Sequence, residues 1–184
     1  MSTPIKGRHG GAVGRVDALA AALAIIAGLG FAHPGNAGEL PQPEGPVVLT
    51  ISGNISQTNA PGTARFDLAM LQDLGVTGFE TSTIWTEGVS LYEGVLLATL
   101  LTHVGAEGST LHAVALNDYT VNFPLQEVHD DGPILAFRRD GAAMPVRDKG
   151  PLWLIYPYDD NPDYRSERIY TRSVWQLDRL RIDP

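Results

Sequence analysis

The amino-acid sequence predicts a single α+β domain in which small β-sheets are accompanied by a few short helices. Most apolar segments are short, rich in β-branched residues and bounded by Gly, Pro, Asn or Asp, which is typical of strands. Two or three segments with helical spacing interrupt them, without the regular alternation of strand and helix that a parallel βαβ array requires. The 184-residue sequence shows no internal repeat, and its length fits one domain that buries its own core.

The first half of the domain contains two predicted strands and two predicted helices. Residues 47–51 are apolar and mostly β-branched, which is typical of a strand. Asp67 can cap a short helix that ends at Gly75, and residues 77–84 return to strand character. Residues 94–104 have apolar side chains at helical spacing, so we expect them to form the clearest helix of the chain.

The second half is predicted to be mostly strands. Residues 111–116 and 119–123 alternate with a period of two, and Asn117-Asp118 between them predicts a hairpin turn. Apolar runs predict further strands at residues 134–137, 152–156 and 174–182.

The first 37 residues have the features of a secretory signal peptide. Basic residues precede an apolar run at 18–31, and Ala37 offers a small residue for cleavage. The run is too short for a spanning helix, which needs ~20 residues. Arg8 and Arg15 are isolated, so we expect a Sec-type signal rather than a twin-arginine signal, and a periplasmic or secreted protein with no membrane attachment after cleavage. The expected organisation is a signal peptide at 1–37, a Pro- and Gly-rich linker at 38–46 and the folded domain at 47–184.

The composition excludes several classes of function. The chain has 13 basic and 21 acidic residues and no basic cluster, so a nucleic-acid partner is not expected. The absence of cysteine excludes disulfides, iron–sulfur ligation and cysteine nucleophiles. His103 and His112 have no partner at metal-ligand spacing, so no metal site is expected. Hydrolase elbows, dinucleotide fingerprints and phosphate loops do not occur in the sequence.

Five short motifs occur in a fixed order along the chain. They are residues 85–88 (WTEG), 92–97 (YEGVLL) with Leu100-Leu101, 115–119 (ALNDY), 132–141 (GPILAFRRDG) with Pro145 and Gly150-Pro151, and 172–175 (RSVW). Together they resemble the sulfite-oxidase-type oxidoreductase molybdopterin-binding domain superfamily. The resemblance extends over about 47–182 and implies a mixed α+β fold of small sheets around a pterin cleft.

The sequence departs from this family at the metal. Catalytic members ligate molybdenum through a cysteine just before the motif that begins here at Tyr92, where the family usually has tryptophan. The resemblance places that position within a residue or two of Ser82, and a hydroxyl is a far poorer ligand than a thiolate. An arginine that the family has after the Gly-x-Pro motif is replaced here by Leu152-Trp153. The expected Sec-type signal also implies export unfolded, whereas loaded members of the family are normally exported folded.

The matched motifs nominate residues for binding a ligand or cofactor. Trp85 and Tyr92 can stack on a flat heterocycle or cover the edge of the core. Arg138 and Arg172 can hold an anionic group or be solvated strand-edge charges. The full set of candidate residues is Thr81, Ser82, Thr83, Trp85, Tyr92, Asn117, Asp118, Arg138 and Arg172. No catalytic residue is assigned.

Two functions follow from these observations. The first is an exported sulfite-oxidase-type domain without redox catalysis, acting as an accessory module that binds a small ligand or a protein partner in the periplasm. No cofactor is expected in this case, although the resemblance makes molybdopterin possible. The alternative is a molybdopterin-dependent oxidoreductase whose atypical molybdenum site lacks a protein thiolate. The sequence leaves open whether the protein is an enzyme.

Overall fold

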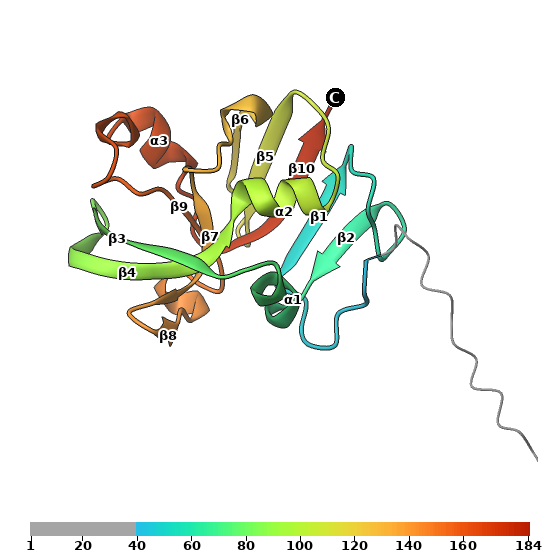
Figure 1. Cartoon of the computed structure of the whole chain (residues 1–184), viewed down its shortest axis with the longest axis horizontal. Coiled ribbons are helices and arrows are strands. Elements are labelled where there is room, and N and C mark those ends of the chain that lie inside the picture. Colours follow the sequence, from blue (N-terminus) through green and yellow to red (C-terminus); the bar gives the residue numbers. More distant parts are fainter. Residues whose placement is uncertain (1–39) are drawn as a thin grey trace, which may run out of the picture. The chain divides into compact units, whose positions relative to one another are not determined.

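The computed structural model describes residues 40–184 (Figure 1). The predicted signal peptide and the first residues of the predicted linker lie outside this range. Residues 41–46 contain no helix or strand, but they lie against the domain, because the backbone amides of Glu44 and Gly45 both donate to the Asp67 carboxylate. Leu40 is buried in the core. Between residues 40 and 184, no helix is long and apolar enough to cross a membrane.

Two small sheets form the body of the domain. The first is mostly antiparallel, with the parallel pair β1/β10 at its centre; its order is β2 (Thr63–Phe66), β1 (Leu49–Gly53), β10 (Leu177–Asp183), β5 (Thr110–Ala115) and β6 (Thr120–Pro124). The second is antiparallel in the order β3 (Thr77–Thr83), β4 (Thr86–Leu96), β7 (Ile134–Arg139) and β8 (Ala142–Ala143), with β9 (Trp153–Ile155) also paired to β7. These sheets and the few short helices confirm the predicted α+β class.

The helices are short and lie between the strands. They are α1 (Leu68–Asp73), α2 (Leu97–His103) and α3 (Glu167–Arg172), with single 3₁₀ turns η1 (Leu125–Glu127), η2 (Val146–Asp148) and η3 (Pro162–Tyr164). Asp67 caps α1 as predicted, because its carboxylate accepts from the Met70 amide at 2.9 Å. Several backbone amides hold this carboxylate, Met70 foremost, and so the pKa of Asp67 is lowered.

The predicted helix at 94–104 is wrong in its first turn. Gly94, Val95 and Leu96 continue β4 and pair with β7, and the helix begins only at Leu97. Gly94 permits this pairing, since a Cβ there would collide with the carbonyl of Leu135. The apolar spacing is compatible with a strand as well as with a helix, because a buried segment of either kind has apolar side chains at these positions.

The predicted strands are confirmed with small shifts of their ends. The β5–β6 hairpin turns at Asn117-Asp118, where Asp118 has a left-handed backbone with φ 64°. The last strand begins at Leu177 rather than Val174, because Gln176 also has a positive φ of 53° and turns the chain before β10. Strands β2, β4 and β8 and helix α3 were not predicted.

The core divides into a large aliphatic cluster and a smaller aromatic one. The aliphatic cluster contains residues of β1, β5 and β10 together with α1 and α2. The second cluster is rich in aromatic side chains: Tyr92, Trp153, Tyr156 and Tyr158 are buried, and Trp85, Tyr164 and Tyr170 pack against them. Trp85 at the turn of the β3–β4 hairpin and Tyr170 of α3 are only partly buried, and their ring centroids lie 5.7 Å apart. The β3–β4 hairpin and α3 lie at the same end of the domain (Figure 1).

Candidate functional site

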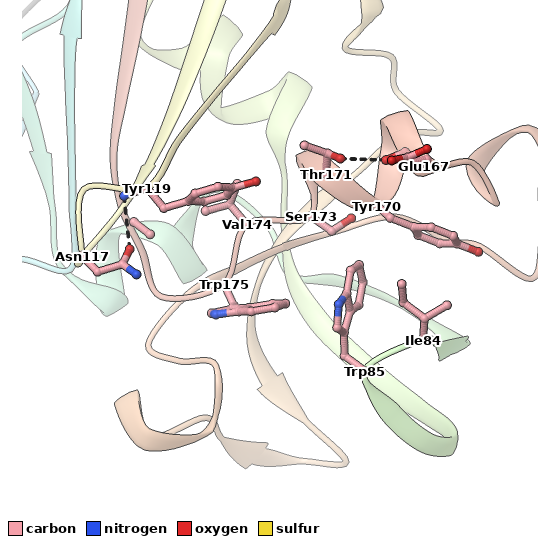
Figure 2. Close-up of a pocket in the computed structure, with 11 residues that line it drawn as sticks. Ile84, Trp85, Asn117, Tyr119, Glu167, Tyr170, Thr171, Ser173, Val174 and Trp175 are labelled. Atoms are coloured by element: carbon pink, nitrogen blue, oxygen red, sulfur yellow. Dashed lines mark hydrogen bonds between the residues drawn. The ribbon is translucent and has the colours of Figure 1, made fainter.

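A cavity of about 580 Å³ opens where the β3–β4 turn, the β5–β6 turn and α3 meet (Figure 2). Its size is within the range of pockets that hold small molecules. The lining is mostly apolar and aromatic, with a few polar side chains: Ile84, Trp85, Ala115, Asn117, Tyr119, Glu167, Tyr170, Thr171, Ser173, Val174 and Trp175.

Trp85 is the central wall of the cavity. Its ring centroid lies 5.6 Å from that of Trp175 and 5.7 Å from that of Tyr170, at interplanar angles of 78° and 85°. Figure 2 shows Trp85 between these two rings. On its inner side it also meets the buried Trp153 ring edge-on at 5.9 Å. The aromatic core therefore supports the position of this wall.

A tight turn presents Trp85 to the cavity. The Thr83 hydroxyl oxygen accepts from the backbone amides of Trp85 at 3.1 Å and Thr86 at 3.0 Å. It is also bonded to the Thr86 hydroxyl at 2.7 Å, which in turn lies 3.3 Å from the Tyr92 hydroxyl. Thr83 and Tyr92 thus position Trp85 rather than reach the cavity themselves, since neither is a lining residue.

The polar groups of the cavity are few. The Asn117 side-chain oxygen accepts a hydrogen bond from the Tyr119 backbone amide at 3.2 Å (Figure 2). This bond orients the Asn117 carboxamide. The Ser173 hydroxyl donates to the carbonyl of Ile169 and is bonded to the Tyr158 hydroxyl, so its hydrogen-bonding capacity is used within the protein. Burial raises the pKa of Tyr158, which keeps this phenol neutral. Glu167 is the single carboxylate of the lining, and the lining has no Lys, Arg or His.

A partly buried ion pair fixes α3, which carries one side of the cavity. Arg172, with a side chain 7% exposed, donates to the Glu127 carboxylate at 2.7 Å. Its guanidinium also lies over the ring of Phe123, 4.9 Å from the centroid. The hydrogen bond from Arg172 lowers the pKa of Glu127. Arg172, a predicted ligand-binding residue, is therefore occupied in holding α3 against β6 and η1.

The polar groups of the residues at the expected metal position already form hydrogen bonds within the protein. The Ser82 amide and hydroxyl both donate to the Asp159 carboxylate, at 2.6 and 2.8 Å. Arg165 donates to the same carboxylate at 2.9 Å. These contacts lower the pKa of Asp159, with the Ser82 amide as the main cause. Thr81 is fully buried, and its hydroxyl accepts from the Asp159 amide.

The structure brings together two of the predicted site residues, Trp85 and Asn117, in the main cavity. Ser82 and Thr83 line a smaller adjoining hollow of about 220 Å³, which shares Ile84 and Tyr170 with the main cavity.

The remaining predicted site residues lie elsewhere. Tyr92 is fully buried, with its ring edge-on to Trp153 at 5.4 Å. Asp118 is ion-paired with Arg179 at 2.6 Å on the surface. Arg138 lies on β7 over the ring of Phe137 and lines neither hollow.

Several lining residues were not predicted. Tyr170 and Glu167 belong to α3, a helix too short to show a helical pattern. Tyr119 and Trp175 were part of matched motifs, and their exposed fractions of 50% and 39% are high for aromatic side chains. The sequence signal that could have identified Tyr119 and Trp175 is that each is an aromatic residue within a matched motif.

The residues present do not fit molybdopterin. Basic side chains form the strongest hydrogen bonds to a phosphate such as that of molybdopterin, yet the cavity lining contains a carboxylate and no Lys or Arg. The chain has no thiolate, and Ser82 is bonded to Asp159. Among residues 40–184, no three His, Asp or Glu side chains are grouped as a metal site would require.

The comparisons with known proteins identify a fold. No family model and no curated protein matches the chain. Among solved structures, it is similar to the sulfane dehydrogenase SoxCD from Paracoccus pantotrophus, with 23% sequence identity and a TM-score of 0.55. The match covers 73% of this chain but only 37% of that one. The likeness shows a similar fold, which agrees with the sulfite-oxidase-like fold that the motifs implied.

Proposed function

We propose that this chain is an exported small-molecule-binding module, and that the ligand binds in the cavity walled by Trp85, Tyr170 and Trp175. One observation carries the proposal: three aromatic rings, one from the β3–β4 turn and two from α3 and the segment after it, converge on a cavity of about 580 Å³. Aromatic walls with a few fixed polar groups are the usual composition of small-ligand sites.

The cavity is built before any ligand arrives. Trp85 is supported from behind by Trp153, and α3 is held by the Glu127–Arg172 pair. Because these walls need little rearrangement, binding costs little conformational entropy. Exposed apolar rim residues such as Ile84, 62% exposed, would be covered by a bound ligand.

The alternative, a molybdopterin-dependent oxidoreductase without a protein thiolate, draws on the likeness of fold. Fold alone carries little information about chemistry. The absence of basic side chains from the cavity lining and the Ser82–Asp159 contact do not support it. We therefore favour ligand binding without redox catalysis.

Three variants test the proposal, and two of them are matched. Ile84 and Val89 belong to the same hairpin and are 62% and 63% exposed, but only Ile84 lines the cavity. A set of small cationic, neutral and anionic compounds is screened against the full protein by NMR, and the compounds that bind are titrated. We expect Ile84→Ala and Trp175→Ala to weaken binding, and Val89→Ala to leave it unchanged. Binding that survives Trp175→Ala, or no binding by any compound, would refute the proposal.

A further inference from the structure

The cavity has a single charge, and that charge is negative. Glu167 is its one ionisable side chain other than tyrosine, and no basic residue lines it. Glu167 is an exposed residue, and its carboxylate attracts a cation and repels an anion. The electrostatics therefore favour a positively charged ligand.

The aromatic rings line the cavity from different directions. Trp85 stands at 78° to Trp175 and at 85° to Tyr170, so the walls meet nearly at right angles. A flat neutral ring can stack on only one such wall, whereas a compact, rounded cation contacts several at once. The negative potential of aromatic faces attracts cations, and tryptophan attracts them more strongly than tyrosine or phenylalanine does.

The protein already places a cation against this aromatic cluster. The Lys149 ammonium lies 5.7 Å from the Trp153 ring centroid and 5.8 Å from that of Trp175. Lys149 is not a lining residue, so it meets Trp175 from outside the cavity. The cluster thus accommodates positive charge, while the side of Trp175 that lines the cavity has no cation of the protein.

We propose that the ligand of this cavity is an organic cation with a quaternary ammonium group. The methylated head group lies against Trp85, Trp175 and Tyr170, with Glu167 as the counter-charge. The rest of the ligand extends along Tyr119 to Asn117, whose amide group provides a hydrogen-bond donor. This inference rests on the proposed function and specifies its ligand class.

A pair of isosteric probes tests the inference with the full protein. Choline carries a trimethylammonium group, and 3,3-dimethylbutan-1-ol has the same shape without the charge. Their dissociation constants are measured by NMR from the indole N–H signals of the three tryptophans. Signals of Trp85 and Trp175 are expected to shift with choline, while that of Trp153 stays, because its N–H is buried and donates to the Ser173 carbonyl. The neutral probe is expected to bind about tenfold more weakly.

Charge variants provide a second readout. Glu167→Gln is expected to weaken choline binding several-fold and to leave binding of the neutral probe unchanged. Glu80→Gln changes the net charge equally at an exposed position outside the cavity, and at ~0.15 M salt, where distant charges are screened, it should have no effect. Lys149→Gln removes a positive charge beside Trp175 and should strengthen choline binding.

The outcomes separate the inference from the proposed function. Equal binding of the two probes, or weaker choline binding in Lys149→Gln, would overturn the cation inference. If only neutral or anionic compounds bind, and Ile84→Ala weakens them, the inference falls while the proposed function stands. If no compound of any charge binds, both fall together.

Discussion

Removing Arg172 should destabilise the domain far more than removing its neighbour Arg168. Both guanidinium groups pair with the Glu127 carboxylate, at 2.7 and 3.1 Å, but the Arg172 side chain is 7% exposed and that of Arg168 is 66% exposed. The contrast isolates burial, because the acceptor is the same. Arg172 also packs over Phe123.

The magnitude follows from these contacts. A hydrogen bond to a charged group contributes about 1.5–3 kcal/mol, and a desolvated cation–π contact adds about 1–2 kcal/mol. Glu127 is 33% exposed, so part of this is lost to solvent screening, and we expect Arg172→Ala to cost about 3 kcal/mol. The exposed pair of Arg168 should contribute less than about 1 kcal/mol.

Thermal and urea unfolding of the two variants measure the difference. For a domain of this size, about 3 kcal/mol lowers Tm by roughly 6–12 °C, against 1–3 °C for Arg168→Ala. Because Arg172 anchors α3, Arg172→Ala should also weaken ligand binding at Tyr170. If the two variants have equal stability, Arg172 is not a structural anchor and its predicted role as an anion-binding residue returns.

Four further predictions address the rest of the structure. Ser82→Ala removes one hydrogen bond to Asp159 and should cost about 1 kcal/mol in urea unfolding without changing ligand affinity; lost binding would make Ser82 a ligand residue. The pKa of Asp159 is lowered in the folded state, so its contribution to stability is present above about pH 4 and is lost as the pH falls through the lowered value. An acid titration followed by carboxyl NMR checks this, and an ordinary pKa for Asp159 would contradict it. The pKa of Tyr158 is raised by burial, so stability should fall above about pH 10, where unfolded tyrosines ionise; Tyr158→Phe should reduce this alkaline loss, and an unaltered alkaline profile would speak against it. Gly94→Ala places a Cβ against the Leu135 carbonyl and should cost about 2 kcal/mol or more, whereas an unchanged urea midpoint would show that β4 and β7 can separate.

Sequence patterns predicted those elements whose structure is determined by residues close to one another in the sequence. Residues 110–115, in which buried and less buried side chains alternate, form strand β5. Asp67 caps α1 through its own side chain. Residues 94–96 were assigned to the wrong element because a buried strand and a buried helix both have apolar side chains at these positions. Only the close approach of Leu135 to Gly94 distinguishes them, and that contact is tertiary.

The candidate site was predictable only in part for the same reason. Trp85 and Asn117 were found because each lies in a motif with a distinctive side chain. Tyr170 reaches the cavity through contacts with a residue far away in sequence, and no local pattern records such a contact. Ser82 was expected at a metal position, but its hydroxyl donates a hydrogen bond to Asp159, 77 residues later.

Metal and pterin analysis of the protein, produced from its full sequence in its own host, tests the central claim most directly. The claim is that this sulfite-oxidase-like fold binds a small ligand in an aromatic cavity and does not use a molybdenum cofactor. We predict a folded protein with neither molybdenum nor pterin in stoichiometric amount. About one molybdenum and one pterin per chain would contradict the account and restore the oxidoreductase alternative.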